Sequence, residues 1–145
     1  MDFIELGYLG LFTGCFLSAT LIPFPSEFIL IGLFEIGYTP VPVVLIATLG
    51  NLGGSFTNYF IGSYANYEKL SRKFNMNEER LARWKKRLDR WGLWLGLLAW
   101  TPFIGDPMVG VLGFFKVPLL GLTVTMFIGK LLRYIVVALL YYSLI

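Results

Sequence analysis

Residues 18–27 read Ser-Ala-Thr-Leu-Ile-Pro-Phe-Pro-Ser-Glu, and they interrupt an apolar segment with two prolines and a carboxylate. The apolar run before them, 3–22, is about long enough to cross a membrane, whereas the run after them, 28–34, is too short to cross alone. Proline removes a backbone donor and breaks a helix, so the stretch leaves backbone polar groups free. Such backbone is tolerated at membrane depth only inside protein or beside a water-filled cavity. The stretch therefore predicts the tip of a hairpin that enters the membrane and returns.

A second stretch of this kind, Trp-Thr-Pro-Phe-Ile-Gly-Asp-Pro, lies at 100–107. Short apolar runs flank it at 91–100 and 108–115, so it also predicts a hairpin tip. Each predicted hairpin is followed by a run that is long enough to span, 41–61 in the first half and 119–143 in the second. The residues expected to break the hairpins, whose tips lie near 23–27 and 102–107, are Pro23, Pro25, Pro102, Gly105 and Pro107.

The two halves of the chain align at an offset of 79 residues. The matching pairs are Pro23 and Pro102, Glu27 and Asp106, Gly50 and Gly129, and Asn51 and Lys130. Pro40 and Pro118 differ by 78, which indicates a one-residue slip in the turn. With one full crossing per half, the second copy is upside down, so we expect two inverted repeats, 1–65 and 92–145, as in many secondary transporters. The alternative is chance agreement among abundant glycines and prolines.

The composition excludes a soluble globular protein. Of 145 residues, 57% are hydrophobic and 14% are charged, whereas soluble domains carry about 25% charged residues. We therefore predict an all-α integral membrane protein that forms a single domain over 1–145. The chain has no histidine and one cysteine, Cys15, which excludes histidine-based metal sites and an intramolecular disulfide. We expect no cofactor and no metal.

Basic residues concentrate in one segment of the chain. Nine of the 12 lysines and arginines fall between residues 69 and 90. Because basic segments that flank membrane spans stay in the cytoplasm, residues 66–91 are predicted to form a cytoplasmic connection between the two halves. A nucleic-acid-binding patch is the weaker interpretation, since membrane segments flank this stretch on both sides.

Residues 75–91 predict an amphipathic helix within that connection. Asn75 and Glu78 suggest a capping box at its start. Its apolar stripe consists of Leu81, Trp84, Leu88 and Trp91, with basic residues on the other faces. We expect this helix to lie in the cytoplasmic interface, near anionic lipids.

Two carboxylates, Glu27 and Asp106, fall at the predicted hairpin tips. A carboxylate at the bilayer centre costs about 2.5–3.5 kcal/mol, so it normally marks a pathway or a paired partner. One interpretation is a proton-titratable or cation-binding pair. The other is that each carboxylate lies at the interface and caps a short helix, since Asp is a good N-cap before a proline.

Two cations, Lys130 and Arg133, lie inside the last predicted span. They are three residues apart and therefore on one helical face. Their anionic partners are either Glu27 and Asp106 or a substrate phosphate, and the sequence does not separate these alternatives. Asn51 stands opposite Lys130 in the repeat.

Four blocks of this sequence together resemble the small YqaA-like branch of the DedA family, also called the SNARE-associated or VTT-domain family. The blocks are 18–27, 47–51, 100–107 and 129–134. The resemblance implies a multi-pass bacterial inner-membrane protein with two opposed re-entrant hairpins. It also implies that the protein moves lipids, notably undecaprenyl phosphate or phospholipids, between leaflets, with a link to the proton gradient in some members.

The resemblance carries over to individual residues only in part. Glu27 matches the family's acidic residue in the first hairpin, and Glu35 is the nearest match to a second acid. Two arginines of larger members align with Ala99 and Gly105, so an anion-binding role would have moved to Lys130 and Arg133.

The leading functional hypothesis is therefore a transporter-like lipid translocase without enzymatic activity. Its expected partners are membrane lipids with anionic headgroups, together with protons or another cation, and a homo-oligomer is compatible with the sequence. A transporter of small ions or solutes and a non-catalytic membrane scaffold are the alternatives. A lipid-modifying enzyme is disfavoured, because Ser26 has only carboxylates as candidate bases.

Overall fold

Every regular element in the part of the chain that the structure describes is helical, as predicted. The computed structural model describes residues 2–20, 25–65, 67–73, 77–100 and 105–144. In chain order the elements are α1 (Phe3–Ala19), α2 (Glu27–Glu35), α3 (Pro40–Ser63), α4 (Tyr67–Lys73), α5 (Glu78–Leu95), the 3₁₀ segment η1 (Gly96–Trp100), α6 (Gly105–Phe114) and α7 (Leu119–Leu144).

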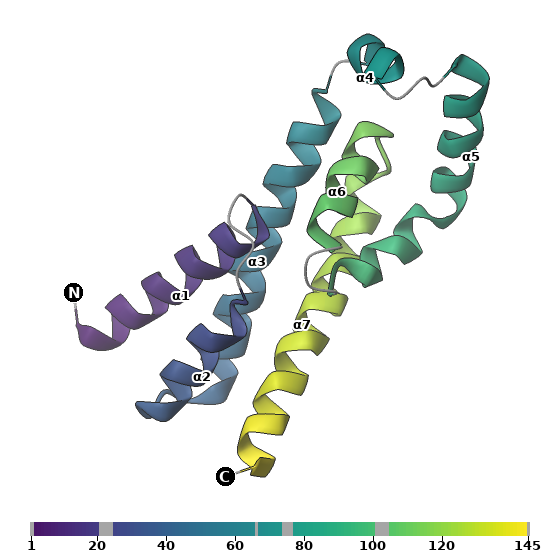
Figure 1. The fold of residues 1–145 in the computed structure, drawn as a ribbon. Helices are drawn as coiled ribbons and strands as arrows, with labels where there is room; N and C mark the ends of the chain where they lie inside the picture. The colour runs from purple at the N-terminus through teal and green to yellow at the C-terminus, as the bar shows by residue number, and fades with distance from the viewer. Residues whose placement is uncertain (1, 21–24, 66, 74–76, 101–104, 145) are drawn as a thin grey trace.

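Two of these helices, α3 and α7, are long and apolar enough to cross a membrane. They have 24 and 26 residues, about 36 and 39 Å at 1.5 Å per residue, against a hydrocarbon core of about 30 Å. The predicted spans 41–61 and 119–143 lie inside them. The outer surface of α7 carries exposed leucines such as Leu139 and Leu140, as expected of a surface that faces lipid. Figure 1 shows α3 and α7 along the length of the molecule.

Helices α1 and α2 form the first hairpin beside α3. Glycines allow a close approach: a Cβ atom on Gly50 would lie 2.6 Å from the carbonyl oxygen of Phe12. The hydroxyl of Tyr38 donates a hydrogen bond of 2.9 Å to the carbonyl oxygen of Phe3, which ties the two open ends of the hairpin together. At this base the rings of Phe34 and Tyr141 are in tilted contact, with centroids 5.3 Å apart. The base therefore lies beside the start of α3 and the end of α7.

The second hairpin has its base at the opposite end of the α3–α7 pair. Its arms are the second half of α5 with η1, and α6 (Figure 1). Gly62 and Gly113 have no room for a Cβ, because backbone oxygens of Gly110 and Tyr59 fill those positions, so α6 contacts the end of α3 closely. Gly92 of α5 faces Val117, in the turn just before α7. The two hairpins therefore approach the middle of the molecule from opposite ends.

The turns that join each hairpin to the long helix after it have the same type of backbone structure at an offset of 79. Gly37 has a φ of 98° and Lys116 a φ of 55°. The amide of Tyr38 donates to Leu33 and the amide of Val117 donates to Leu112, at 3.0 and 3.1 Å. These are the left-handed residue and the six-to-one hydrogen bond of a Schellman motif.

The helices after these turns also begin 79 residues apart, at Pro40 and Leu119. The one-residue slip inferred from Pro40 and Pro118 is therefore wrong for the backbone. The prolines occupy neighbouring positions at the start of a helix, where a missing amide costs little. This correspondence covers the turns alone, and the inverted repeat as a whole stays a prediction.

The amphipathic helix differs from the expectation at both ends. It begins at Glu78 with Asn77 as its N-cap, whose side chain accepts a hydrogen bond of 2.8 Å from the amide of Arg80, whereas Asn75 lies outside the described residues. It continues to Leu95 and so includes the first part of the apolar run expected to be separate at 91–100. The predicted apolar stripe is divided: Leu81 and Leu88 are buried, whereas Trp84 and Trp91 are exposed.

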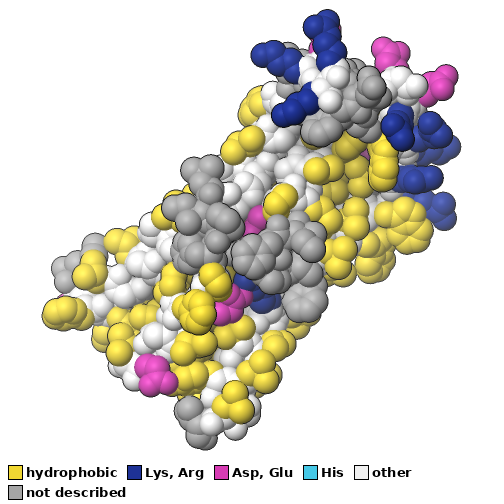
Figure 2. Space-filling view, viewed as in Figure 1, with side chains coloured by type: hydrophobic (Ala, Val, Ile, Leu, Met, Phe, Trp, Pro, Cys, Tyr) yellow, Lys and Arg dark blue, Asp and Glu magenta, His cyan; other side chains and the backbone are white. Residues whose placement is uncertain are grey.

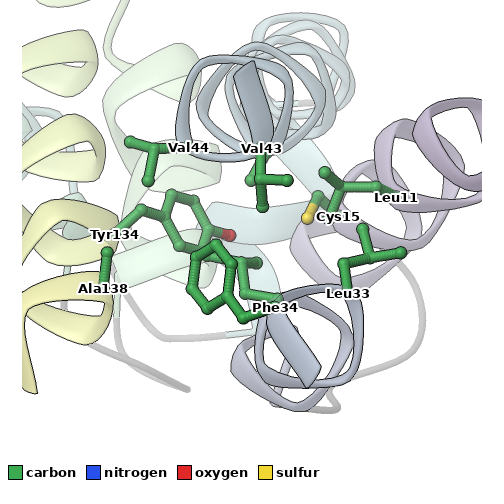
Figure 3. Close-up of a cluster of buried hydrophobic side chains, with 10 residues drawn as sticks. Leu11, Cys15, Leu33, Phe34, Val43, Val44, Tyr134 and Ala138 are labelled. Carbon is green, nitrogen blue, oxygen red and sulfur yellow. The ribbon is translucent and has the colours of Figure 1, made fainter. Parts of the chain in front are cut away.

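A four-helix core supports the first hairpin. Figure 3 shows its members: Leu11 and Cys15 from α1, Leu33 and Phe34 from α2, Val43 and Val44 from α3, and Tyr134 and Ala138 from α7. Because α7 contributes to this core, the first hairpin is fixed to a helix from the other half of the chain.

Candidate functional site

Lys130 lies at the middle of the molecule with its side chain fully buried. Its ammonium group donates a hydrogen bond to the side-chain oxygen of Asn51 on α3 and lies 3.5 Å from Oδ1 of Asp106 on α6. The Asp106 side chain is 19% exposed. A buried cation is tolerated only when it is paired and hydrogen-bonded, and these two residues meet both requirements.

Arg133 forms a second ion pair one turn further along α7. Its Nε lies 2.5 Å from Oε1 of Glu27, and Nη2 contacts the same oxygen. The guanidinium also lies over the ring of Tyr134, 5.6 Å from the centroid. The Arg133 and Glu27 side chains are 11% and 23% exposed. The face shared by Lys130 and Arg133 therefore meets one carboxylate from each hairpin.

Both carboxylates lie in the first turn of a helix, Glu27 in α2 and Asp106 in α6. A negative charge is stabilised there by the helix dipole. The capping interpretation does not fit Glu27, because Ser26 occupies the N-cap position. Asp106 is the second residue of α6, and its side chain points to Lys130 and to Ser55, whose hydroxyl lies 3.4 Å from Oδ1.

A network of neutral polar groups holds the charges in place. Asn51 donates to the carbonyl oxygen of Cys15 and to the hydroxyl of Ser18, both at 3.4 Å. Asn58 donates to the carbonyl oxygen of Ala19 at 2.5 Å and to that of Asp106 at 3.3 Å. Asn58 therefore connects the end of α1 to the start of α6.

Tyr134 and Ser26 form a further hydrogen bond between the halves, 2.7 Å between their hydroxyl oxygens. Sequence reasoning missed both residues as members of the network, and also missed Ser55. One signal was present, because Ser55 and Tyr134 each lie four residues after a predicted site residue, Asn51 and Lys130, and so on the same helical face.

The structure brings together all five residues predicted for the pathway: Asn51, Lys130, Arg133, Glu27 and Asp106. Figure 2 shows acidic and basic side chains in the middle of the molecule, beside apolar surface. Glu35, the weaker match to a family acid, lies elsewhere: it is exposed at the end of α2 and accepts a hydrogen bond of 2.8 Å from Tyr141.

The predicted hairpin-breaking residues have different positions. Pro25 directly precedes the turn into α2, whereas Pro23 and Pro102 lie outside the described residues. Gly105 and Pro107 were expected to break a helix, but they lie in the first turn of α6. A proline is compatible with this position, because the first amides of a helix have no intrahelical acceptor.

Comparison with known proteins identifies the family. A model of the VTT domain matches residues 22–143. The chain belongs to the VTT-domain family, the DedA or SNARE-associated family. It is 35% identical over 134 residues to the inner membrane protein YqaA of Escherichia coli K12, with 92% of this chain and 89% of that protein covered. YqaA of Shigella flexneri matches equally well.

A third relative is an uncharacterised protein of Haemophilus influenzae, 33% identical over 143 residues, which cover 92% of this chain and 85% of that one. No solved structure matches the chain. The protein is an inner-membrane protein. The VTT-domain match, the similarity to the YqaA proteins and the two long apolar helices all support this location. Within the described residues, no group of three Cys, Asp or Glu side chains could hold a metal ion.

Proposed function

We propose that this VTT-domain protein moves lipids of the undecaprenyl phosphate or phospholipid class across the inner membrane, and that protons drive or gate the movement. One observation carries the proposal: Lys130 and Arg133 on one face of α7 are each paired with a carboxylate from a different hairpin. Phosphate binds Arg and Lys through the same charge-assisted hydrogen bonds as a carboxylate does. A lipid phosphate can therefore take the place of either carboxylate.

Protonation supplies the exchange step in this mechanism. A carboxylate that gains a proton loses its attraction for the cation, and the cation then becomes available to a phosphate. Arg133 would hold that phosphate with its planar fork, and Lys130 would add a point charge. Because the hairpins approach from opposite ends, release of Glu27 and release of Asp106 would open the site toward different sides, as in inverted-repeat transporters.

The test is headgroup-resolved lipid translocation in proteoliposomes, with and without a pH gradient. We expect Arg133→Met to abolish translocation, whereas Arg90→Gln, which removes an exposed cation of α5, should leave it unchanged. Translocation by Arg133→Met at the wild-type rate would contradict the proposal. Gradient-driven flux of a small ion without lipid movement would favour the small-ion or solute transporter. The absence of both activities would favour the scaffold.

A further inference from the structure

A pocket lies away from the charge cluster, at the end of the molecule where α5 begins. Its volume is about 540 Å³, within the usual range for ligand sites. The described residues that line it come from the end of α3, the start of α5 and the turn between α6 and α7, and they include Ser63, Glu78, Lys85, Phe114, Phe115 and Lys116. It therefore combines two lysines with an apolar wall.

The cavity lies at the level where a membrane span ends. Ser63 is the last residue of α3, and Lys116 lies three residues before α7 begins. The turn that carries Lys116 is held rigidly against α3, because the hydroxyl of Tyr59 donates a hydrogen bond of 2.6 Å to the carbonyl oxygen of Val117. A ligand in this cavity would meet the ends of both spans, which is the depth of lipid headgroups.

The backbone of Lys116 is an independent sign that its side chain matters. Lys116 is the one non-glycine residue with positive φ among the described residues, and the equivalent turn at the other end of the molecule has Gly37 there. A left-handed conformation costs a non-glycine residue roughly 1–2 kcal/mol. Strain of this kind is typical of functional positions. Glycine would suit the turn better, so the fold does not explain the lysine.

The charge of the cavity favours an anion. Lys85 and Lys116 contribute two positive charges, and neither has an ion-pair partner within the described residues. Glu78 contributes one negative charge, but it lies seven residues before Lys85 and therefore about 10 Å away along the α5 axis. The lining thus has a net positive charge, and the phenylalanines beside it offer a surface for acyl chains.

We propose that this cavity binds the phosphate of an anionic phospholipid, held by Lys85 and Lys116 with its acyl chains along Phe114 and Phe115. The site is separate from the cluster around Lys130 and does not depend on whether the protein translocates lipid. By the distribution of basic residues, its lipid belongs to the cytoplasmic leaflet.

The test is calorimetric titration of the purified full chain, in an uncharged detergent, with short-chain phosphatidylglycerol. Lys85→Gln and Lys116→Gly should each weaken binding about tenfold, because each removes a charge-assisted hydrogen bond. Lys86→Gln is the matched control: it removes the neighbouring lysine of α5, which does not line the cavity, and should weaken binding less than about twofold. Without lipid, Lys116→Gly should unfold at the wild-type temperature or above, because glycine relieves the strained turn.

Three results would overturn the proposal. The first is wild-type affinity in both Lys85→Gln and Lys116→Gly, and the second is an equal loss in Lys86→Gln, which would indicate surface charge alone. The third is inorganic phosphate binding as tightly as the lipid, which would make the cavity a site for a free anion. Arg133→Met separates this proposal from the proposed transport, since we expect it to lose translocation and keep lipid binding here.

Discussion

Lys130 donates a hydrogen bond to Asn51, the residue that precedes it by 79 positions. The same offset relates Glu27 to Asp106, and Gly37 to Lys116. If a two-fold axis relates the halves, a residue that contacts the equivalent residue of the other half must lie beside that axis. Lys130 and Asn51 would then mark the centre of the molecule. This centre is chemically unequal, because one half contributes a cation and the other a neutral amide.

The first prediction concerns Asn51. Asn51→Ala removes a hydrogen-bond acceptor from a fully buried ammonium group and should lower the free energy of unfolding by about 1.5–3 kcal/mol. Asn51→Asp keeps the acceptor but loses the amide that donates to Cys15 and Ser18, so it should recover only part of the stability. Reversible unfolding in detergent micelles measures both variants. Thr57→Ala, which removes a hydroxyl bonded to its own helix at 3.3 Å, is the control on α3. Wild-type stability of Asn51→Ala would contradict the role of the amide.

The second prediction concerns the contact between α3 and α6. Gly62→Ala and Gly113→Ala would place a methyl group on a backbone oxygen, which cannot move without separating the helices. Each should cost about 1–3 kcal/mol. Gly32→Ala is the control, because nothing lies within 4 Å of its Cβ position and alanine favours a helix by roughly 1 kcal/mol. A thermal-unfolding series in which all three variants behave alike would show that the close contact does not hold the hairpin.

Much of this arrangement could be predicted from local features of the sequence. Proline positions and the lengths of apolar runs were enough to locate α3 and α7 and the interruptions before them, because a helix must be about 30 Å long to cross a bilayer. The offset of 79 placed Asn51 opposite Lys130 before any contact was known.

The remaining features depend on how helices rotate and slide against one another. The partners of Ser55, Asn58 and Tyr134 lie 39 to 108 residues away and depend on the close contacts that glycines permit. The start of α5 was predicted two residues too early because Asn75 and Asn77 are both good N-caps. Pro107 was predicted in a break before the helix because proline is favoured both in a break and in the first turn of a helix.

The third prediction concerns topology. If residues 66–91 are cytoplasmic, a cysteine at Lys73 should react with a membrane-impermeant reagent only after the cells are permeabilised. The native Cys15 is fully buried, so it should give no background signal. A second cysteine at Ile36, an exposed residue beside the turn at the opposite end, should show the reverse pattern. Labelling of Lys73→Cys in intact cells would show that the protein has the opposite orientation in the membrane.

The fourth prediction concerns the shape of the Arg133 side chain. Arg133→Lys keeps the charge but loses Nε and Nη2, the two nitrogens that reach Glu27. If Arg133 also holds a lipid phosphate, this variant should translocate lipid at least about tenfold more slowly, because an ammonium cannot reproduce the fork. Translocation assays on Arg133→Lys and the wild type decide the point. Equal rates would mean that charge alone is needed.

The last prediction separates a structural role of the Lys130–Asp106 pair from a role in transport. Asp106→Asn leaves a fully buried ammonium group with Asn51 and without a counter-charge, which should cost about 3–5 kcal/mol. Lys130→Met should cost less, because Asp106 is 19% exposed and can reach water. The double variant removes both charges, so it should recover most of the stability that Asp106→Asn loses.

Unfolding and lipid translocation measured on the same four proteins give the answer. Recovered stability without translocation would mean that the pair is structural at rest and that Lys130 is also needed for the phosphate. Recovery of both would exclude phosphate binding by Lys130, and Arg133 would have to bind the headgroup alone. A double variant whose loss of stability equals the sum of the two single losses would show that the two residues are not energetically coupled, because the cycle measures the departure from that sum.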